Sequence, residues 1–511
     1  MDYFDSVTSQ THRKIDRAVD RFFNTADRNR PTVVLLPGGM GSRLRRAWPA
    51  HNPASTANPT SFSTIWLDCG VIWAQDALKL TIDTGGFDLD RRIVVADREV
   101  DFFVDPYGRA IDTFDNWNFN VVVFGWDWRR HVLKGVAALE YLVTELRDGA
   151  QTRWNRAILD KLFLVGHSMG GMVAKLFMGH HAGLAAECGG VITVGTPFYG
   201  YFEHLGRFYY GDETFNPLYG ALPAAQVVSS LPGLYSLLPI DLITWQDVGA
   251  TIGLAAYPVT DKDTGNPVDP YGVLATLRYP PWVRDTEIPI GLQVRHDLAA
   301  PLPSTVAGKL FHLRADVPNS TQAAAVWRSD ISPDYEPGDQ PKPITFSKGG
   351  GDNTIPTWSA RLASTPGTHV TDFDHGEHMF LMEDNHVLIR IREIINGILA
   401  GTIVVSPMIA QPEGGEGERE IAAAPADTGR RSARQAASGD GKYYRASDED
   451  VEALEKSVGE QPKVASKKEA TDFIQKVKRG ELKPGQVYDR GYGEELVPPP
   501  IVRRLMQESG F

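Results

Sequence analysis

The sequence predicts an α/β fold built on a mostly parallel sheet, and three observations support this prediction. Short apolar runs rich in β-branched residues, typical of strands buried on both faces, recur through the first 200 residues. Segments with apolar residues at helical spacing separate them. One run leads directly into a Gly-x-Ser-x-Gly turn and then a helical pattern. The runs are 32–36, 120–128, 162–165 and 191–197.

Length and composition indicate a globular protein with one large domain. The chain has 511 residues, of which 42% are hydrophobic and 23% charged, which allows a large domain with insertions and a smaller appendage. No run approaches the roughly 18 consecutive apolar residues of a transmembrane helix. The N-terminus has neither the basic leader nor the apolar core of a signal peptide, so we expect a cytoplasmic protein.

Charge and cysteine content exclude other classes of protein. A formal net charge of -12 argues against nucleic acid as a partner, because neutralising phosphates requires clustered Lys and Arg. The two cysteines, Cys69 and Cys188, can form neither a disulfide framework nor a cysteine-based metal site. No HExxH pattern or His/carboxylate cluster in the sequence suggests a metal site, and no dinucleotide fingerprint follows the first strand, so we expect no metal and no cofactor.

The first elements are a helix and a strand. Residues 1–30 predict an amphipathic N-terminal helix. The strand at 32–36 ends in the glycine-rich turn 37–41, whose exposed backbone N–H groups make it a natural contributor to an oxyanion hole. A tight turn without function is the alternative. A phosphate-binding loop is disfavoured, because no Gly-Lys-Ser/Thr follows.

Two irregular stretches interrupt the alternation of strands and helices. Between 51 and 115 we expect an excursion from the main sheet that carries aromatic residues near the site, and Trp66 and Trp126 are candidates for lining a substrate pocket. Between 198 and 343, Pro, Gly, Tyr and Trp are dense and periodicity is poor. An insertion of this length is usually a lid or cap over the site. We expect the sheet to resume at 344–347.

The main domain is predicted to span residues 31–408. A strand at 369–373 and a helix at 385–399 close it. Beyond it, 409–441 shifts to Gly, Glu, Ala, Ser and Arg without periodicity, which predicts a flexible linker.

The tail, residues 442–511, contains two short helical patterns, at 448–457 and 467–479. A small docking module and a disordered tail are equally compatible with this pattern, and no partner of the tail can be named.

Ser168 is the candidate nucleophile. A serine at the tip of a strained strand-to-helix turn needs neighbouring glycines, so that the backbone can close around it. The same turn aims the backbone N–H of Met169 at the place where a tetrahedral oxyanion would form. The strand before, the helix after and the extra Gly171 are the context that the motif requires; a purely structural turn is the alternative. His167 is expected to point away from Ser168 and to pack or hydrogen-bond.

A serine nucleophile needs a base that a buried carboxylate orients, in the chain order Ser, acid, His for this kind of turn. Asp352 follows a predicted strand and a glycine turn, which would place it at the carboxyl edge of the sheet; an Asp that only stabilises the turn is the alternative. Asp374 is the second candidate acid. For the base, His378 lies just before the final helix and is preferred to His375.

Seven short segments form a series along the chain: 36–44 (LPGGMGSRL), 64–68 (TIWLD), 126–129 (WDWR), the serine turn, 195–197 (GTP), 351–356 (GDNTIP) and 375–378 (HGEH). In this order they resemble the lecithin:cholesterol acyltransferase-like branch of the α/β-hydrolases, over about residues 30 to 400. The TIWLD and WDWR segments are much more specific than the serine turn.

The resemblance implies an α/β-hydrolase fold with Ser168 as nucleophile, Asp352 as acid and His378 as base. It also implies that the backbone N–H groups of Met40 and Met169 form the oxyanion hole. The donor would be an acyl ester, most often of a lipid, and the acceptor water or an alcohol. The secreted members carry a signal peptide and a lid disulfide, from which this chain departs.

We therefore expect a serine-dependent lipid acyl hydrolase or O-acyltransferase whose donor is a phospholipid or another lipid ester. Hydrolysis and acyl transfer remain open, because the difference lies in how well the site admits the acceptor and excludes water. The expected partners are the lipid or ester substrate and, transiently, a membrane surface. A carboxylesterase for small soluble esters is one alternative, and a non-catalytic lipid-binding or scaffold protein on a hydrolase fold is another.

Overall fold

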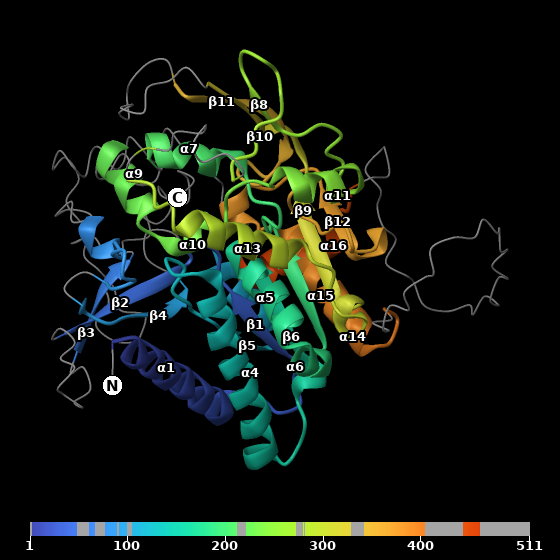
Figure 1. Ribbon diagram of the computed structural model, residues 1–511. Helices are drawn as coiled ribbons and strands as arrows, with labels where there is room; N and C mark the ends of the chain where they lie inside the picture. The colour runs from blue at the N-terminus through green and yellow to red at the C-terminus, as the bar shows by residue number, and fades with distance from the viewer. Residues whose placement is uncertain are drawn as a thin grey trace, which may run out of the picture.

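A parallel six-stranded sheet forms the centre of the computed structural model, with strand order β12-β9-β7-β6-β1-β5 (Figure 1). The structure describes residues 3–48, 61–66, 77–88, 91–99, 105–211, 221–271, 280, 282–328, 342–403 and 443–459. Every neighbouring pair in this sheet is parallel, which confirms the predicted α/β fold class. The strands are β1 (Thr32–Leu36), β5 (Asn120–Val123), β6 (Leu162–His167), β7 (Gly190–Val194), β9 (Leu310–Ala315) and β12 (Val370–Phe373).

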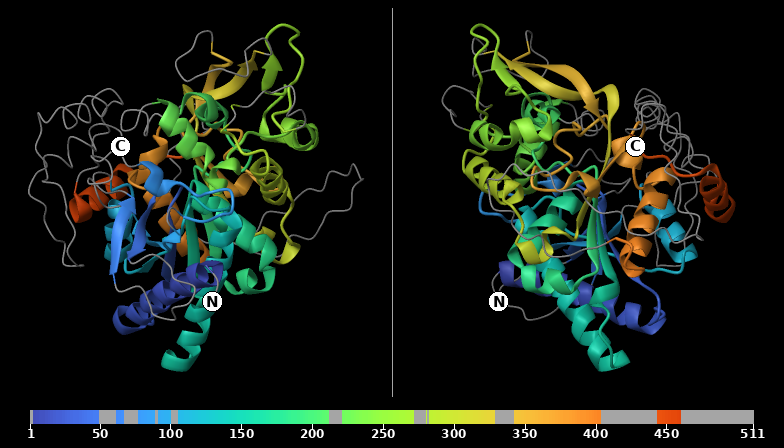
Figure 2. Two further views of the ribbon diagram at one scale, coloured as in Figure 1. Left: turned by 60° about the vertical axis from the view of Figure 1, so that its left-hand side comes forward. Right: turned by 90° about the vertical axis from the view of Figure 1, so that its right-hand side faces the viewer.

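Two hydrophobic cores lie on opposite faces of the sheet, because successive side chains of a strand alternate between its faces. Val34 and Leu36 of β1 pack in the core that contains α4 and α5. Val33 and Leu35 pack in the core that contains α3, α15 and α16. Figure 2 shows α15 and α16 together on one side of the molecule. The helices concerned are α3 (Gly108–Asn116), α4 (Val132–Trp154), α5 (Met169–His180), α15 (Asn385–Leu399) and α16 (Asp448–Val458). Both faces of the sheet are therefore covered, as its continuous apolar strands require.

The N-terminal helix and the excursion form one side of the molecule. Helix α1 (Tyr3–Thr25) packs its apolar side, including Phe22 and Phe23, into the core of α4. The strands β2 (Ser42–Trp48), β3 (Ser61–Trp66) and β4 (Val94–Glu99) form a separate antiparallel sheet in the order β3-β2-β4, next to η1 (Ala77–Leu80). The chain therefore leaves the main sheet already at Ser42, before the predicted start at residue 51.

The prediction that the main sheet resumes at 344–347 is wrong. That segment belongs to β11 (Ile344–Gly351), which pairs antiparallel with β10 (Val317–Trp327) in a second small sheet completed by β8 (Val259–Asp261). The main sheet resumes earlier, at β9, inside the region predicted to be the insertion. His312 and Arg314 break the apolar pattern of β9, and both are buried with polar partners, Thr193 and Thr365 for the histidine and Asp372 for the arginine.

The insertion between β7 and β9 is mainly helical. A fully buried arginine, Arg295, ties it to the loop after β7 by donating to the carbonyl oxygens of Pro197 and Phe198, and it also donates to that of Ser236. In Figure 1, α7, α9 and the small sheet formed by β8, β10 and β11 lie above the main sheet. The helices of the insertion are α7 (Phe202–Tyr210), α9 (Ala221–Ser229), α10 (Pro232–Tyr235), α11 (Leu242–Ile252), α13 (Glu287–Ala299) and α14 (Ser304–Ala307). Another short helix, α6 (Ala182–Glu187), lies before the insertion, between α5 and β7.

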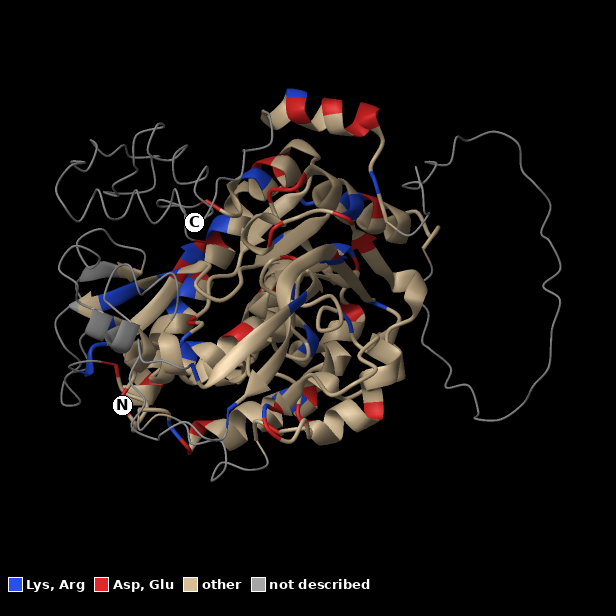
Figure 3. Cartoon of the chain, turned by 90° about the horizontal axis from the view of Figure 1, so that it is seen from above, with Lys and Arg blue, Asp and Glu red and all other residues tan. Residues whose placement is uncertain are grey.

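The segment 443–459 docks on the α15 face of the main domain. Leu454 is buried there, and Tyr444 packs edge-on against Phe373. Helix α16 is rich in acidic residues (Figure 3), and Asp450 pairs with Arg392 at 2.8 Å. Residues 443–459, the start of the predicted tail, therefore pack on the main domain. The predicted linker 409–441 and the second helical pattern at 467–479 lie outside the described residues.

No helix within the described part of the chain is both long enough and apolar enough to span a bilayer.

Gly170 allows α5 to start directly against β1, and its replacement should be costly. A Cβ on Gly170 would lie 2.1 Å from the carbonyl oxygen of Leu36. We expect Gly170→Ala to lower the free energy of unfolding by about 2–4 kcal/mol through overpacking. The matched control is Gly183→Ala in α6, where a Cβ meets nothing within 4 Å and a gain of about 0.5–1 kcal/mol is expected. Urea unfolding measures both, and equal midpoints for the two variants would contradict this account of the turn.

Candidate active site

Ser168 lies in a strained turn between β6 and α5. Its backbone has φ 52° and ψ −125°, a conformation that costs a non-glycine residue about 1–3 kcal/mol. The backbone N–H of Ser168 donates to the carbonyl oxygen of Val194 at 2.9 Å, and Gly171 packs so closely that a Cβ would come 1.8 Å from Thr196 Oγ1. The turn thus presents Ser168 at the carboxyl edge of the parallel sheet, where ligands gather in α/β folds.

His378 and Asp352 line up with Ser168. Ser168 Oγ is 2.9 Å from His378 Nε2, and His378 Nδ1 is 2.8 Å from Asp352 Oδ2. A carboxylate can only accept, so Nδ1 carries the proton and Nε2 is free to accept from the serine hydroxyl. Ser168 is 8% exposed and Asp352 is 1% exposed. The structure therefore brings together the three residues that were preferred from the sequence.

Asp352 reaches the site by a route that differs from the prediction. It follows β11, a strand of the second sheet, rather than a strand of the main sheet. Its Oδ1 accepts from the backbone N–H groups of Thr354 and Ile355, and its backbone oxygen accepts from the N–H of His378 at 2.8 Å. Asp352 therefore stabilises its turn and contacts the histidine at the same time.

The second candidates, Asp374 and His375, form a network of their own. His375 Nδ1 lies 2.8 Å from Asp374 Oδ1, and Nε2 lies 3.3 Å from Asp384 Oδ2. Asp374 also pairs with Arg445 of the docked segment. His375 thus connects Asp374 and Asp384, the two ends of the loop 374–384 that carries His378, without contacting Ser168 itself.

The turn 37–41 lies against the serine. A Cβ on Gly38 would come 2.8 Å from Ser168 Cβ, and one on Gly39 would come 2.6 Å from Met169 Sδ. The N–H of Gly38 donates to Tyr107 Oη and that of Gly41 to the carbonyl oxygen of Gly38. Among the described residues, no acceptor is used by the N–H groups of Gly39 and Met40, so Gly39 joins Met40 and Met169 as a candidate oxyanion donor.

The two tryptophans proposed for the substrate pocket hold this turn in place. Trp66 Nε1 donates to the carbonyl oxygen of Met40 at 2.7 Å, and Trp126 Nε1 donates to that of Pro37 at 2.9 Å. Both side chains are buried. Their role in lining a substrate pocket stays a prediction, whereas their contacts fix the turn.

Tyr107 is a site residue that sequence reasoning missed. It precedes α3, and its hydroxyl lies 2.9 Å from His167 Nδ1. His167 Nε2 lies 2.8 Å from the backbone oxygen of His378. No motif surrounds Tyr107 in the sequence, and only the fold brings it to the turn. His167 is a hydrogen-bonding residue, as predicted.

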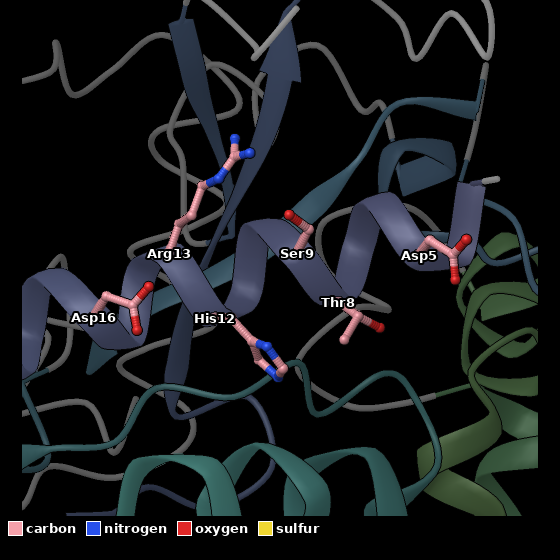
Figure 4. Close-up of a pocket in the computed structure, with 6 residues that line it drawn as sticks. All are labelled: Asp5, Thr8, Ser9, His12, Arg13 and Asp16. Carbon is pink, nitrogen blue, oxygen red and sulfur yellow. The ribbon is translucent and has the colours of Figure 1, made fainter. Parts of the chain in front are cut away.

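The described residues hold no group of three or more His, Cys, Asp or Glu side chains that could bind a metal ion. A shallow hollow of about 460 Å³ lies on α1, far along the chain from the serine turn, and no site residue lines it (Figure 4). There, His12 stacks on Tyr141 of α4 with ring centroids 3.8 Å apart.

His375 makes stability depend on pH. Its hydrogen bond to Asp384, together with the charges of Asp384 and Asp374, raises the pKa of His375 to about 9. Because this pKa is raised above the unfolded value of about 6.5, the stabilisation is complete below pH 6.5 and lost as the pH rises through about 9. The side chain is 34% exposed, so we expect a loss of only about 1–2 kcal/mol.

The measurement is the free energy of unfolding at pH 6.5, 8 and 9.5 for the wild type and His375→Asn. Burial lowers the pKa of Lys175 to about 8, which acts with the opposite sign in this window, so only the difference between the two proteins is informative. His386, whose ring lies 4.9 Å away, and Arg445 are the other charged or titratable groups facing the network. A difference that stays constant with pH would contradict the assignment.

The parallel sheet with helices on both faces, and the serine turn at its carboxyl edge, have the architecture of the α/β-hydrolase fold. The model of the lecithin:cholesterol acyltransferase family matches residues 116–269 and confirms the resemblance found in the sequence. A comparison with curated proteins finds no match.

Eleven chains of solved structures match. One of them, described as "The crystal structure of Tle4-Tli4 complex", is 13% identical and has a TM-score of 0.48. The match covers 73% of this chain and 99% of that one.

Proposed function

We propose that this protein is a serine-dependent lipid acyl hydrolase or O-acyltransferase that works through an acyl-enzyme on Ser168. The observation that supports the proposal most is the hydrogen-bonded line from Ser168 Oγ through His378 to buried Asp352. A serine hydroxyl is a weak nucleophile at neutral pH, and this arrangement supplies the base and the carboxylate that activate it.

In the first half-reaction, His378 Nε2 takes the proton of Ser168 Oγ while Oγ attacks the ester carbonyl carbon. The carbonyl π electrons move to oxygen, where the N–H of Met169 and those of Met40 or Gly39 stabilise the negative charge. When the tetrahedral intermediate collapses, His378 gives its proton to the leaving alkoxide. An alcohol departs, and the acyl group stays on Ser168.

In the second half-reaction, water or an alcohol attacks the acyl-enzyme and gives its proton to His378. Collapse of the second intermediate releases a fatty acid or a new ester and returns the proton to Ser168. Asp352 keeps Nδ1 protonated and stabilises the imidazolium in both halves. No cofactor enters this cycle.

The lipid nature of the donor rests on the family match over 116–269. Because such donors reside in bilayers, the proposal includes transient contact with a membrane surface. A carboxylesterase for small soluble esters would use the same three residues and is the second candidate. A non-catalytic role is disfavoured, because nothing in the aligned side chains is missing for catalysis.

The proposal is tested with phosphatidylcholine vesicles that carry a labelled acyl chain, with and without a long-chain alcohol, alongside p-nitrophenyl butyrate. We expect labelled fatty acid or labelled ester to be released by the wild type and not by Ser168→Ala, and the product identifies the acceptor. Turnover of the soluble ester alone would favour the carboxylesterase. No turnover of either substrate would count against an enzyme of this class.

A further inference from the structure

We propose that Tyr107 and His167 are positioning residues that join the turn 37–41 to the base His378, so that the oxyanion donors and the base are held together around Ser168. This inference rests on the proposed function and deepens it. The two groups that the chain of hydrogen bonds connects, the N–H of Gly38 and the backbone oxygen of His378, come from opposite ends of the domain.

The groups at the two ends of this series of hydrogen bonds, a backbone N–H and a backbone carbonyl oxygen, determine the direction of each hydrogen bond between them. The carbonyl oxygen of His378 can only accept, so His167 Nε2 must donate to it. In the neutral imidazole the other nitrogen, Nδ1, carries no hydrogen and accepts the hydrogen bond that the Tyr107 hydroxyl donates at 2.9 Å. The Tyr107 oxygen in turn accepts from the N–H of Gly38 at 2.8 Å. Only one placement of the hydrogens satisfies the whole series, and in it every donor faces an acceptor.

His167 is well suited to lie beside a base that becomes charged. The rings of His167 and His378 have centroids 4.9 Å apart. Burial and the neighbouring His378 hold the pKa of His167 well below its usual range, so that its ring stays neutral. A neutral ring does not oppose the imidazolium that forms on His378 when Ser168 attacks, whereas a charged one would repel it.

Both positioning side chains are buried, 2% exposed for Tyr107 and 4% for His167, so water cannot replace the lost bonds freely. Gly38 lies directly against Ser168, where an added Cβ would come 2.8 Å from Ser168 Cβ. A shift of this turn relative to His378 would therefore separate the oxyanion donors from the base. Misplacement of reacting groups by about 1 Å can cost 100-fold in rate.

The test compares Tyr107→Phe with a matched control, Tyr235→Phe. Tyr235 is also fully buried, and its hydroxyl also donates to one backbone group, the Ser229 oxygen, and accepts from another, the Arg284 N–H, both at 2.8 Å. Both variants lose the same number of hydrogen bonds, but only Tyr107 is connected to the site. Thermal unfolding and circular dichroism check that each variant folds.

We expect Tyr107→Phe to lower kcat on the labelled phospholipid by about 10- to 100-fold with KM changed less than about 2-fold, and to slow labelling by a fluorophosphonate in parallel. Tyr235→Phe should leave kcat within about 2-fold. His167→Leu should lose as much as Tyr107→Phe, and His167→Gln should recover part of the rate, because its amide can donate to the His378 oxygen.

Equal kcat values for Tyr107→Phe and Tyr235→Phe would overturn the inference, as would equal losses in His167→Gln and His167→Leu. If the wild type labels at Ser168 and Tyr107→Phe labels at the same rate, only this inference fails. If the wild type does not label, the proposed function fails and the inference with it.

Discussion

Ser168→Ala is expected to lower kcat by about 10⁴- to 10⁶-fold, because it removes the nucleophile while His378 and Asp352 stay in place. The residual rate would come from the oxyanion donors and substrate binding alone. Steady-state hydrolysis of the labelled phospholipid measures the loss. A rate within about tenfold of the wild type would show that another group is acylated.

The companion variant Ser168→Gly separates activity from folding. Ser168 has a positive φ of 52°, and release of this strain, about 1–3 kcal/mol, offsets the roughly 0.5–1 kcal/mol of backbone entropy that glycine costs. We therefore expect Ser168→Gly to be as inactive as Ser168→Ala and at least as stable as the wild type in urea. A destabilised Ser168→Gly would contradict the strained turn.

Asp352→Asn is expected to lower kcat by about 10³- to 10⁴-fold with little change in stability. The amide oxygen can still accept from the N–H groups of Thr354 and Ile355, so the turn survives. An amide nitrogen facing His378, however, favours the tautomer whose Nε2 carries the proton, and that nitrogen can no longer accept from Ser168.

The matched control is Asp374→Asn, which removes the other candidate acid. Asp374 pairs with His375 and Arg445 rather than with the base, so we expect kcat to change by less than about 3-fold. The kcat for phospholipid hydrolysis and the free energy of unfolding in urea are measured for both variants. A larger loss of activity in Asp374→Asn than in Asp352→Asn would make Asp374 the acid.

The elements that could be predicted from the sequence are those that a pattern of neighbouring residues produces. The strands β1, β6 and β7 are buried along their whole length and appear as continuous apolar runs, and the serine turn carries its own glycines. Strand β9 was missed because two of its six residues, His312 and Arg314, are polar, and they are tolerated only through partners on β7, on β12 and near residue 365. Such compensation depends on tertiary contacts and leaves no periodic signal.

In the candidate site, too, the sequence predicts residues that lie beside a local pattern and misses those that only tertiary contacts bring to the site. Asp352 and His378 could be selected because each follows an expected strand or precedes an expected helix, although Asp352 turned out to follow a strand of the second sheet. Tyr107 could not be selected, since its neighbours carry no motif and its hydroxyl meets Gly38 and His167 only in the folded chain. The docking of 443–459 likewise depends on the α15 face that receives it.

The most direct test of the central claim is to find the acylated residue. The wild type is treated with a fluorophosphonate at neutral pH, the intact mass is measured, and the modified peptide is sequenced by mass spectrometry. The account predicts one adduct per chain, located on Ser168, and none in Ser168→Ala. An adduct on another residue, or an equal adduct in Ser168→Ala, would contradict it.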